Sequence, residues 1–144
     1  MINARTDAFY TSSGSPGEKL SESIRRGNKY REAGADCVFV QPVCDREMIA
    51  TLVKEIHAPI NILANPGIGS GMPPSVRELQ DLGVARVSLG SGLMKATLAL
   101  IKKVADELSE RGTYNALLDA MTPLPDAAIA YKMAIGQDKG GPSR

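Results

Sequence analysis

The sequence predicts an α/β fold in which four parallel β-strands alternate with helices, a (βα)4 succession. Strand-like runs are centred near residues 4, 38, 62 and 87, and a helical segment separates each from the next. Gly34 and Gly83 stand where two of these helices end. Because strand–helix–strand crossovers are right-handed, the four strands run parallel. Either an open doubly wound sheet or one half of an eight-stranded barrel satisfies this pattern.

Length and composition restrict the classes of function. The 144 residues fit one domain, and a net charge of +1 with 4% aromatic residues gives no basis for binding nucleic acid. No run is long and apolar enough for a membrane span, and the amino terminus lacks a signal pattern, so we expect a cytoplasmic protein. Cys37, Cys44 and the single histidine, His57, lack metal-ligand spacing, which favours free thiols and no zinc site.

The first strand, residues 2–8 (INARTDA), has one polar face. Alternation places Asn3, Arg5 and Asp7 together on it. Both faces of a parallel strand are normally covered, so an inward arginine needs an anionic partner. That partner is either a carboxylate such as Asp7, in a salt bridge, or a bound ligand.

Residues 11–18 (TSSGSPGE) follow as a polar loop at the carboxyl end of this strand. Such a loop is either a mobile flap over a site or a plain exposed linker. A helix is then expected to begin between residues 18 and 21 and to run to residue 33, with Leu20, Ile24 and Tyr30 as its apolar stripe.

The next strand, residues 36–40, ends at Gln41-Pro42, and Asp45 has the position of an N-cap for a helix over 46–56. The third strand, residues 59–65 (PINILAN), places Asn61, Leu63 and Asn65 on the face that Arg5 shares. A glycine- and proline-rich loop follows over residues 66–74.

Ser75 is expected to cap a helix that ends at Leu82, ahead of the fourth strand, residues 85–89. Gly90, Ser91 and Gly92 then connect this strand to a helix over 93–111. Backbone N–H groups at such a helix start suit an anion or phosphate, although the same turn also serves tight strand-to-helix packing alone. Two short helices, over 114–118 and 126–135, and a frayed end at 137–144 complete the chain.

Four segments together resemble the second half of the isocitrate lyase / phosphoenolpyruvate mutase superfamily. They are INARTDA, AGADCVFV, PINILANPG and LGVARVSLGSGLMKAT, in that order and spacing. The resemblance covers residues 1–118, with residues 119–144 as a helical extension and tail. It implies the (βα)4 half of a TIM (β/α)8 barrel, rather than an open sheet.

The resemblance also implies chemistry. Members of this superfamily are Mg²⁺-dependent lyases and phosphonomutases that act on C–C or P–C bonds of 2-oxo acids and related carboxylates or phosphonates, through an enolate. The arginine of the ARTDA motif, here Arg5, grips the anionic group of the substrate, a bidentate task suited to guanidinium. Asn65 lies near the position of an asparagine that contacts substrate in the lyase branch.

Two departures from the family pattern matter. Isocitrate and methylisocitrate lyases carry a glutamate where this chain has Gln41-Pro42, which favours a mutase-like or decarboxylase-like member. The metal-coordinating acidic residues and the mobile catalytic loop belong to the first half of the barrel. Asp7, Asp36 and Asp45 match no metal-ligand position, so we assign no metal ligand and no catalytic residue within this chain.

A half-barrel exposes two sheet edges and the inner faces of its strands. We therefore expect one of two explanations. The chain is the product of an internal start or a truncation of a longer enzyme, which is the favoured explanation, or it binds a partner that completes the barrel. That partner is a separately encoded first half or a second copy. In the family the last helix packs on a neighbouring subunit of a tetramer, and residues 119–136 are expected to do the same. The competing function is a noncatalytic module that self-associates or binds an anionic metabolite.

Overall fold

The computed structural model describes residues 1–68, 71–122 and 124–134. By its internal contacts the chain divides into two compact units, Met1–Lys95 and Ala96–Arg144, which are described separately below. The frayed end predicted at 137–144 lies outside the described residues. The division at residue 118, which concerned how far the family resemblance extends, stays a prediction.

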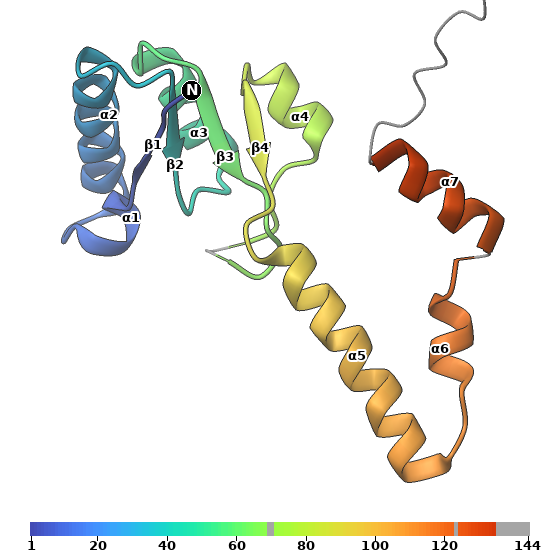
Figure 1. Ribbon diagram of the computed structural model, residues 1–144. Coiled ribbons are helices and arrows are strands. Elements are labelled where there is room, and N and C mark those ends of the chain that lie inside the picture. Colours follow the sequence, from blue (N-terminus) through green and yellow to red (C-terminus); the bar gives the residue numbers. More distant parts are fainter. Residues whose placement is uncertain (69–70, 123, 135–144) are drawn as a thin grey trace, which may run out of the picture. The chain divides into compact units, whose positions relative to one another are not determined.

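Four parallel strands form the sheet of the first unit. They pair side by side in chain order, β1-β2-β3-β4 (Figure 1). Their bounds are β1 Asn3–Thr6, β2 Cys37–Val40, β3 Ile60–Leu63 and β4 Arg86–Ser88. The predicted (βα)4 succession is confirmed, and each strand is shorter than the range predicted for it.

Helices follow every strand. Their bounds are α1 Ala8–Thr11, α2 Pro16–Glu32, α3 Arg46–Glu55, α4 Val76–Asp81, α5 Gly92–Arg111, α6 Asn115–Ala120 and α7 Leu124–Ala134. Asp45 caps α3 by accepting a hydrogen bond from the backbone N–H of Met48, and Ser75 caps α4 in a capping box with Glu78. Both predicted N-caps are confirmed.

The segment between β1 and α2 differs from the sequence prediction. The predicted strand continued to residue 8, but the chain turns at Asp7 into the single helical turn α1. The predicted loop over 11–18 is also too long, because α2 begins at Pro16. Ser15 caps this helix in a capping box with Glu18, and proline at the first helical position needs no N–H partner.

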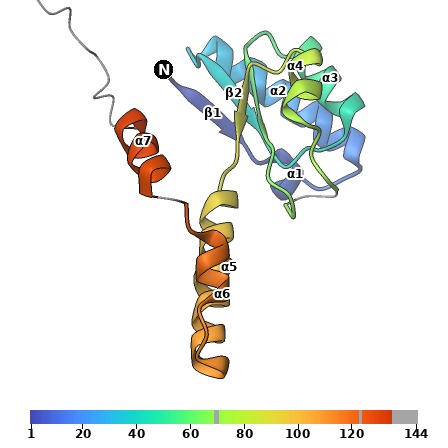
Figure 2. The same ribbon diagram turned by 90° about the vertical axis from the view of Figure 1, so that its right-hand side faces the viewer.

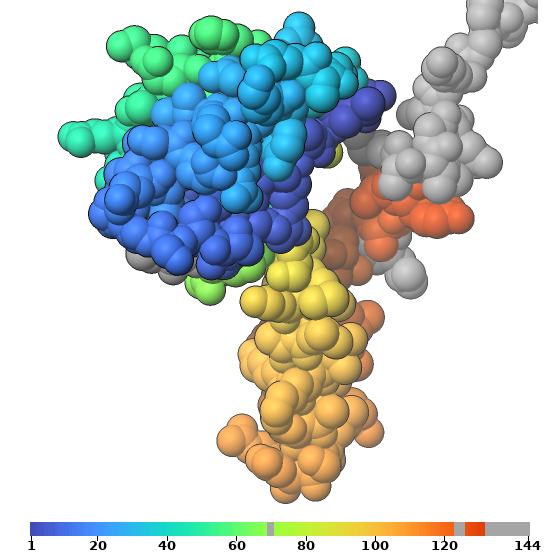
Figure 3. All heavy atoms as spheres, turned by 90° about the vertical axis from the view of Figure 1, so that its left-hand side faces the viewer, coloured from blue at the N-terminus to red at the C-terminus, as the bar shows by residue number. Residues whose placement is uncertain are grey.

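All the core-forming helices of this unit cover one face of the sheet. Buried side chains of α3 and α4 pack with alternate residues of β2 and β3, and half-buried side chains of α2 join them. These residues are Val38, Val40, Ile60 and Ile62 on the strands, with Leu20, Ile24, Ile49, Leu52 and Leu79 on the helices. Figure 2 shows these helices beside the sheet, and α2 (blue) forms much of the face seen in Figure 3.

This winding decides between the two folds that the sequence left open. A doubly wound sheet reverses its strand order and carries helices on both faces. Here the strand order never reverses, and the helices that build the core share one side. That is the winding of one half of a (β/α)8 barrel, so the open-sheet alternative is wrong.

The opposite face of the sheet, called the inner face below, carries the polar strand residues. The strand register places Arg5, Phe39, Asn61 and Arg86 in one row across β1, β2, β3 and β4. Because laterally paired residues of a parallel sheet point to the same side, these four side chains share the inner face. The prediction that Arg5 and Asn61 lie on a common face is confirmed.

The second unit contains most of α5 together with α6 and α7. The carboxylate of Glu107 on α5 accepts hydrogen bonds from the backbone N–H groups of Asn115 and Ala116, at 2.9 and 2.7 Å, and from the hydroxyl of Thr113. These bonds satisfy N–H groups at the start of α6 and lower the pKa of Glu107. No described helix combines the length and the apolar character needed to cross a bilayer.

Candidate functional site

Arg5 lies where β1 ends, on the inner face. Its Nε atom is 2.7 Å from Oδ1 of Asp7, and its side chain is 54% exposed. The hydrogen bond from Arg5 lowers the pKa of Asp7, and the same bond raises the pKa of Arg5. Of the two partners that the sequence left open for Arg5, the structure contains the carboxylate.

Gln41 completes this cluster from the end of the neighbouring strand. It is 6% exposed, and its amide contacts both charged groups. In one amide orientation its nitrogen is 3.3 Å from Oδ1 of Asp7, and in the other its oxygen is 2.8 Å from Nη2 of Arg5. Sequence reasoning treated Gln41 only as a replacement for glutamate; its position at the end of β2, beside β1, is the signal for this contact.

Asn65 lies just beyond β3, in a more enclosed position. Its side chain is 2% exposed, and its Nδ2 atom has no hydrogen-bond partner among the described residues. A buried amide donor without an acceptor is costly, and it is a common mark of a site that a ligand fills.

The Gly90-Ser91-Gly92 turn lies against Asn65. A Cβ at Gly92 would be 3.2 Å from Oδ1 of Asn65, and a Cβ at Gly90 would be 2.9 Å from Cδ1 of Leu63. Close packing therefore explains why both positions are glycine. It also brings the start of α5 beside the orphaned amide, although the N–H of Gly92 is itself bonded to the carbonyl of Leu89.

A cavity of about 300 Å³ opens at this place. Asn65, Gly92 and Lys95 line it together with the apolar side chains of Leu89 and Leu93. It thus combines a buried amide donor with a cationic side chain. Arg5 does not line this cavity, so the structure does not bring the two predicted substrate-binding residues into contact.

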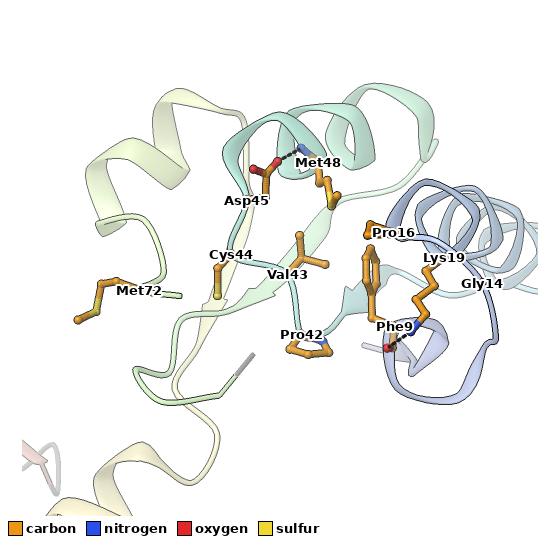
Figure 4. A pocket seen from close by; sticks show the side chains of 10 residues that line it. All are labelled: Phe9, Gly14, Pro16, Lys19, Pro42, Val43, Cys44, Asp45, Met48 and Met72. Carbon is orange, nitrogen blue, oxygen red and sulfur yellow. Dashed lines mark hydrogen bonds between the residues drawn. The ribbon is translucent and has the colours of Figure 1, made fainter. Parts of the chain in front are cut away.

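A larger cavity, of about 490 Å³, lies between α1, the start of α2 and the segment from β2 to α3. Figure 4 shows Phe9, Val43 and Met48 in its wall, with Lys19 donating a hydrogen bond to the carbonyl of Phe9. Phe9 and Val43 belong to the core between the sheet and its helices. Most of its lining residues follow the carboxyl ends of β1 and β2 along the chain, and it contains none of the predicted site residues.

The aspartates and cysteines that the sequence singled out lie outside the candidate site. Asp36 accepts a hydrogen bond from the backbone N–H of Ile2 at 2.6 Å, and Asp45 caps α3. Cys37 is buried and Cys44 half-buried, and burial raises the pKa of both thiols. Within the described ranges no three His, Cys, Asp or Glu side chains come together as a metal site. The Mg²⁺ that the family resemblance implies therefore has no site of three or more such side chains among the described residues.

Known proteins resemble this chain in sequence over most of its length. The family described as Phosphoenolpyruvate phosphomutase matches residues 1–109. An uncharacterised protein of Mycobacterium tuberculosis is 34% identical over 110 residues, 76% of this chain and 39% of its own length. The 2-methylisocitrate lyase of Aeropyrum pernix is 28% identical over 122 residues, 84% of this chain and 37% of its own.

Among solved structures, a candidate lyase/mutase from Burkholderia cenocepacia superposes with a TM-score of 0.72 at 31% identity. The superposition covers 92% of this chain and 44% of that one. The chain thus spans less than half the length of the relatives it matches. The match over residues 1–109, which includes the Arg5 and Asn65 segments, shows that the chain belongs to the phosphoenolpyruvate phosphomutase family.

Proposed function

We propose that this chain is the substrate-anchoring half of a Mg²⁺-dependent lyase or phosphonomutase. Its substrates are 2-oxo acids or related carboxylates and phosphonates, in which the enzyme makes or breaks a C–C or P–C bond. The observation that carries the proposal is the buried, unpartnered Nδ2 of Asn65 beside the start of α5. An anionic oxygen of a substrate is the acceptor this donor lacks.

Arg5, which does not line the cavity beside Asn65, supplies the positive charge of a second proposed substrate contact at the end of β1. Its guanidinium carries five N–H donors in a fixed fork, and Asp7 accepts from Nε. The exposed half of the side chain leaves donors for a carboxylate or phosphonate, which binds guanidinium in bidentate geometry. Asp7 and Gln41 then hold the guanidinium in place before substrate arrives, which lowers the entropy cost of binding.

Gln41 bears on the branch of the family. A glutamine amide carries no charge next to Arg5, whereas a glutamate would compete with an anionic substrate for the guanidinium. This favours a mutase or decarboxylase over the isocitrate-type lyases. The Mg²⁺ ligands, and the groups that move protons, belong in this proposal to the part of the enzyme outside the described residues. A cytoplasmic location and assembly into a homo-oligomer remain part of the same proposal.

The substitution Arg5→Lys in the assembled enzyme tests this function. We expect kcat/KM for the active substrate, chosen from pyruvate, oxaloacetate and phosphonopyruvate assayed with Mg²⁺, to fall at least about tenfold, because lysine cannot form the bidentate contact. Arg25→Lys, on α2, is the matched control and should leave kcat/KM unchanged. A loss within about threefold for Arg5→Lys would contradict the proposal.

A noncatalytic half-barrel that binds an anionic metabolite without turning it over is the second candidate. The absence of a metal-ligand cluster among the described residues favours it. The pure chain separates the two: Mg²⁺-dependent turnover that EDTA abolishes would exclude the noncatalytic module. Binding of phosphonopyruvate to the pure chain with no turnover, under conditions in which an assembled enzyme is active, agrees with both.

A further inference from the structure

Lys95 is a cationic side chain in the wall of the cavity beside Asn65. It lies near the start of α5 and belongs to the same compact unit as the sheet. Its side chain is exposed and forms no ion pair or hydrogen bond with any described residue. The cavity therefore contains a positive charge that has no partner within the described part of the chain.

Three further features of this cavity favour an anion. The Nδ2 atom of Asn65 is a buried donor without an acceptor among the described residues. The start of α5 carries the positive end of the helix dipole, and its first turn has no acidic residue. No carboxylate side chain of the described residues lines the cavity. Lys95 thus adds to a positive potential that no described group in the cavity wall neutralises.

The remaining wall of the cavity is apolar. It consists of Ala64, Pro66, Leu89 and Leu93, beside the glycine that starts α5. A charged contact is stronger beside apolar surface than in open water, because less water screens it. The oxygens of a carboxylate or phosphonate each accept hydrogen bonds, so one such group can take a bond from the amide and another from the ammonium. The volume, about 300 Å³, is within the range of small-molecule sites.

Arg5 lies outside this cavity. Its guanidinium is held by Asp7 at the end of β1, whereas Asn65 follows β3 and Lys95 is on α5. An anionic group inside the cavity therefore leaves the remaining donors of Arg5 unused. A substrate that satisfies both places needs two anionic groups joined by a short chain.

We infer that Lys95 is a specificity-determining residue that, with Asn65, binds a second anionic group of the substrate while Arg5 binds the first. This inference rests on the proposed function, in which Asn65 and Arg5 both contact substrate. It narrows the substrates to compounds with two anionic groups, such as oxaloacetate and phosphonopyruvate. A monocarboxylate such as pyruvate leaves either Lys95 or Arg5 without an anion and is a poor substrate.

Succinate and butyrate are a matched pair of probes. They have the same carbon chain length, and a methyl group in butyrate replaces one carboxylate of succinate. NMR titration of the 144-residue chain measures both dissociation constants from the side-chain amide signal of Asn65 and the Nε–H signal of Arg5. We expect succinate to shift both signals with a single dissociation constant. It should bind at least about fivefold more tightly than butyrate, because each charged contact adds affinity.

Substitution of Lys95 tests its role in this preference. Lys95→Gln removes the charge and keeps a polar side chain, so we expect succinate to bind at least about fivefold more weakly, close to the affinity of butyrate. Lys95→Arg keeps the charge and should bind succinate within about threefold of the original chain. Lys103→Gln is the control, because Lys103 is exposed on the same helix and lies outside the cavity.

Circular dichroism establishes that each variant folds, and Lys95→Met is a second neutral variant if Lys95→Gln does not fold. Three results would overturn the inference. They are a titration in which succinate does not shift the Asn65 amide signal, neutral Lys95 variants that bind succinate within about twofold of the original affinity, and a Lys103→Gln variant that loses as much affinity as Lys95→Gln.

The titration also separates this inference from the proposed function. It involves no Mg²⁺ and no turnover, whereas Arg5→Lys is judged by kcat/KM of the assembled enzyme. Succinate binding that does not depend on Lys95, together with a large loss of kcat/KM in Arg5→Lys, would remove the inference alone. Unchanged kcat/KM in Arg5→Lys, together with succinate binding that depends on Lys95, would remove the proposed function and leave the anion contact of Lys95.

Discussion

The side-chain oxygen of Asn65 lies 3.2 Å from the point where a Cβ at Gly92 would stand. The close approach joins the end of the third strand to the first residue of α5, and it places a buried amide donor at a helix start. Glycine at position 92 thus leaves room for the side chain of Asn65. The sequence could not show this contact, because the two residues are 27 positions apart.

Gly92→Ala should disturb this contact. The added methyl group is closer to Asn65 than ordinary packing allows, so we expect a loss of about 1 kcal/mol of unfolding free energy. In an Asn65→Ala background the same change should be neutral or stabilising by up to about 1 kcal/mol, because alanine favours helix over glycine. Urea unfolding of the four proteins measures this cycle. Equal effects in the two backgrounds would show that Asn65 is not what Gly92 accommodates.

The Arg5–Asp7 pair predicts a pH dependence of stability. The pKa of Asp7 is lowered in the folded chain, so its contribution is present above the unfolded pKa, about 4, and is lost as the pH falls through the folded pKa. Because both side chains are at least a third exposed, at 54% and 36%, solvent screening limits this contribution to about 1 kcal/mol.

Asp7→Asn should therefore be less stable than the original chain at pH 7, and the difference should shrink as the pH approaches 2. Urea unfolding at pH 7, 4 and 2 measures it. Asp119→Asn is the control, because Asp119 is exposed and makes no ion pair with a described residue. A difference that stays constant over this range would mean that Asp7 and Arg5 are not coupled in solution.

The N-cap of α4 gives a prediction about local structure. The hydroxyl of Ser75 accepts a hydrogen bond from the N–H of Glu78 at 3.3 Å, and the Glu78 carboxylate accepts one from the N–H of Ser75 at 2.7 Å. Ser75→Ala should lower the unfolding free energy by about 1 kcal/mol, and Ser75→Asp should retain most of it. The helix holds Leu79, which is fully buried, so the loss should appear in the global thermal transition. An Ala variant as stable as the Asp variant would contradict this.

Sequence reasoning succeeded where the information is local. The caps at Asp45 and Ser75 and the apolar stripe of Leu20, Ile24 and Tyr30 follow from residue spacing within one helix. Alternation along the first strand placed Arg5 on the polar face, and the strand register agrees.

It failed where the structure depends on other segments. α1 is a single turn held by bonds to the carbonyl of Asp7, too short to leave a periodic signal. Ser15 caps α2, but sequence reasoning assigned it to a loop because Gly14 and Gly17 flank the Ser15-Pro16 pair. The contact of Gln41 with Arg5 and Asp7 requires the pairing of β1 with β2, and the orphaned amide of Asn65 requires the packing of α5. Neither is encoded in spacing along the chain.

The pair formed by Asn61 and Ser88 is another contact that only the register reveals, and it gives the last prediction. Asn61 is fully buried, with its Nδ2 3.0 Å and its Oδ1 3.1 Å from the hydroxyl of Ser88. Ser88→Ala leaves both amide atoms without this partner, so we expect a loss of about 1–3 kcal/mol of unfolding free energy. Ser21→Ala should change the unfolding free energy by less than about 0.5 kcal/mol, because among the described residues the exposed hydroxyl of Ser21 bonds only to the carbonyl of Gly17 on α2.

The double variant Asn61→Leu/Ser88→Ala separates a lost hydrogen bond from a lost contact. Leucine has the same branching as asparagine and no polar atoms to satisfy, so the double variant should regain most of the stability that Ser88→Ala loses. Urea unfolding measures all four proteins. If the double variant were no more stable than Ser88→Ala, the cost would lie in packing of the inner face. The inner face would then stabilise the fold through side-chain packing and not through the hydrogen bonds between Asn61 and Ser88.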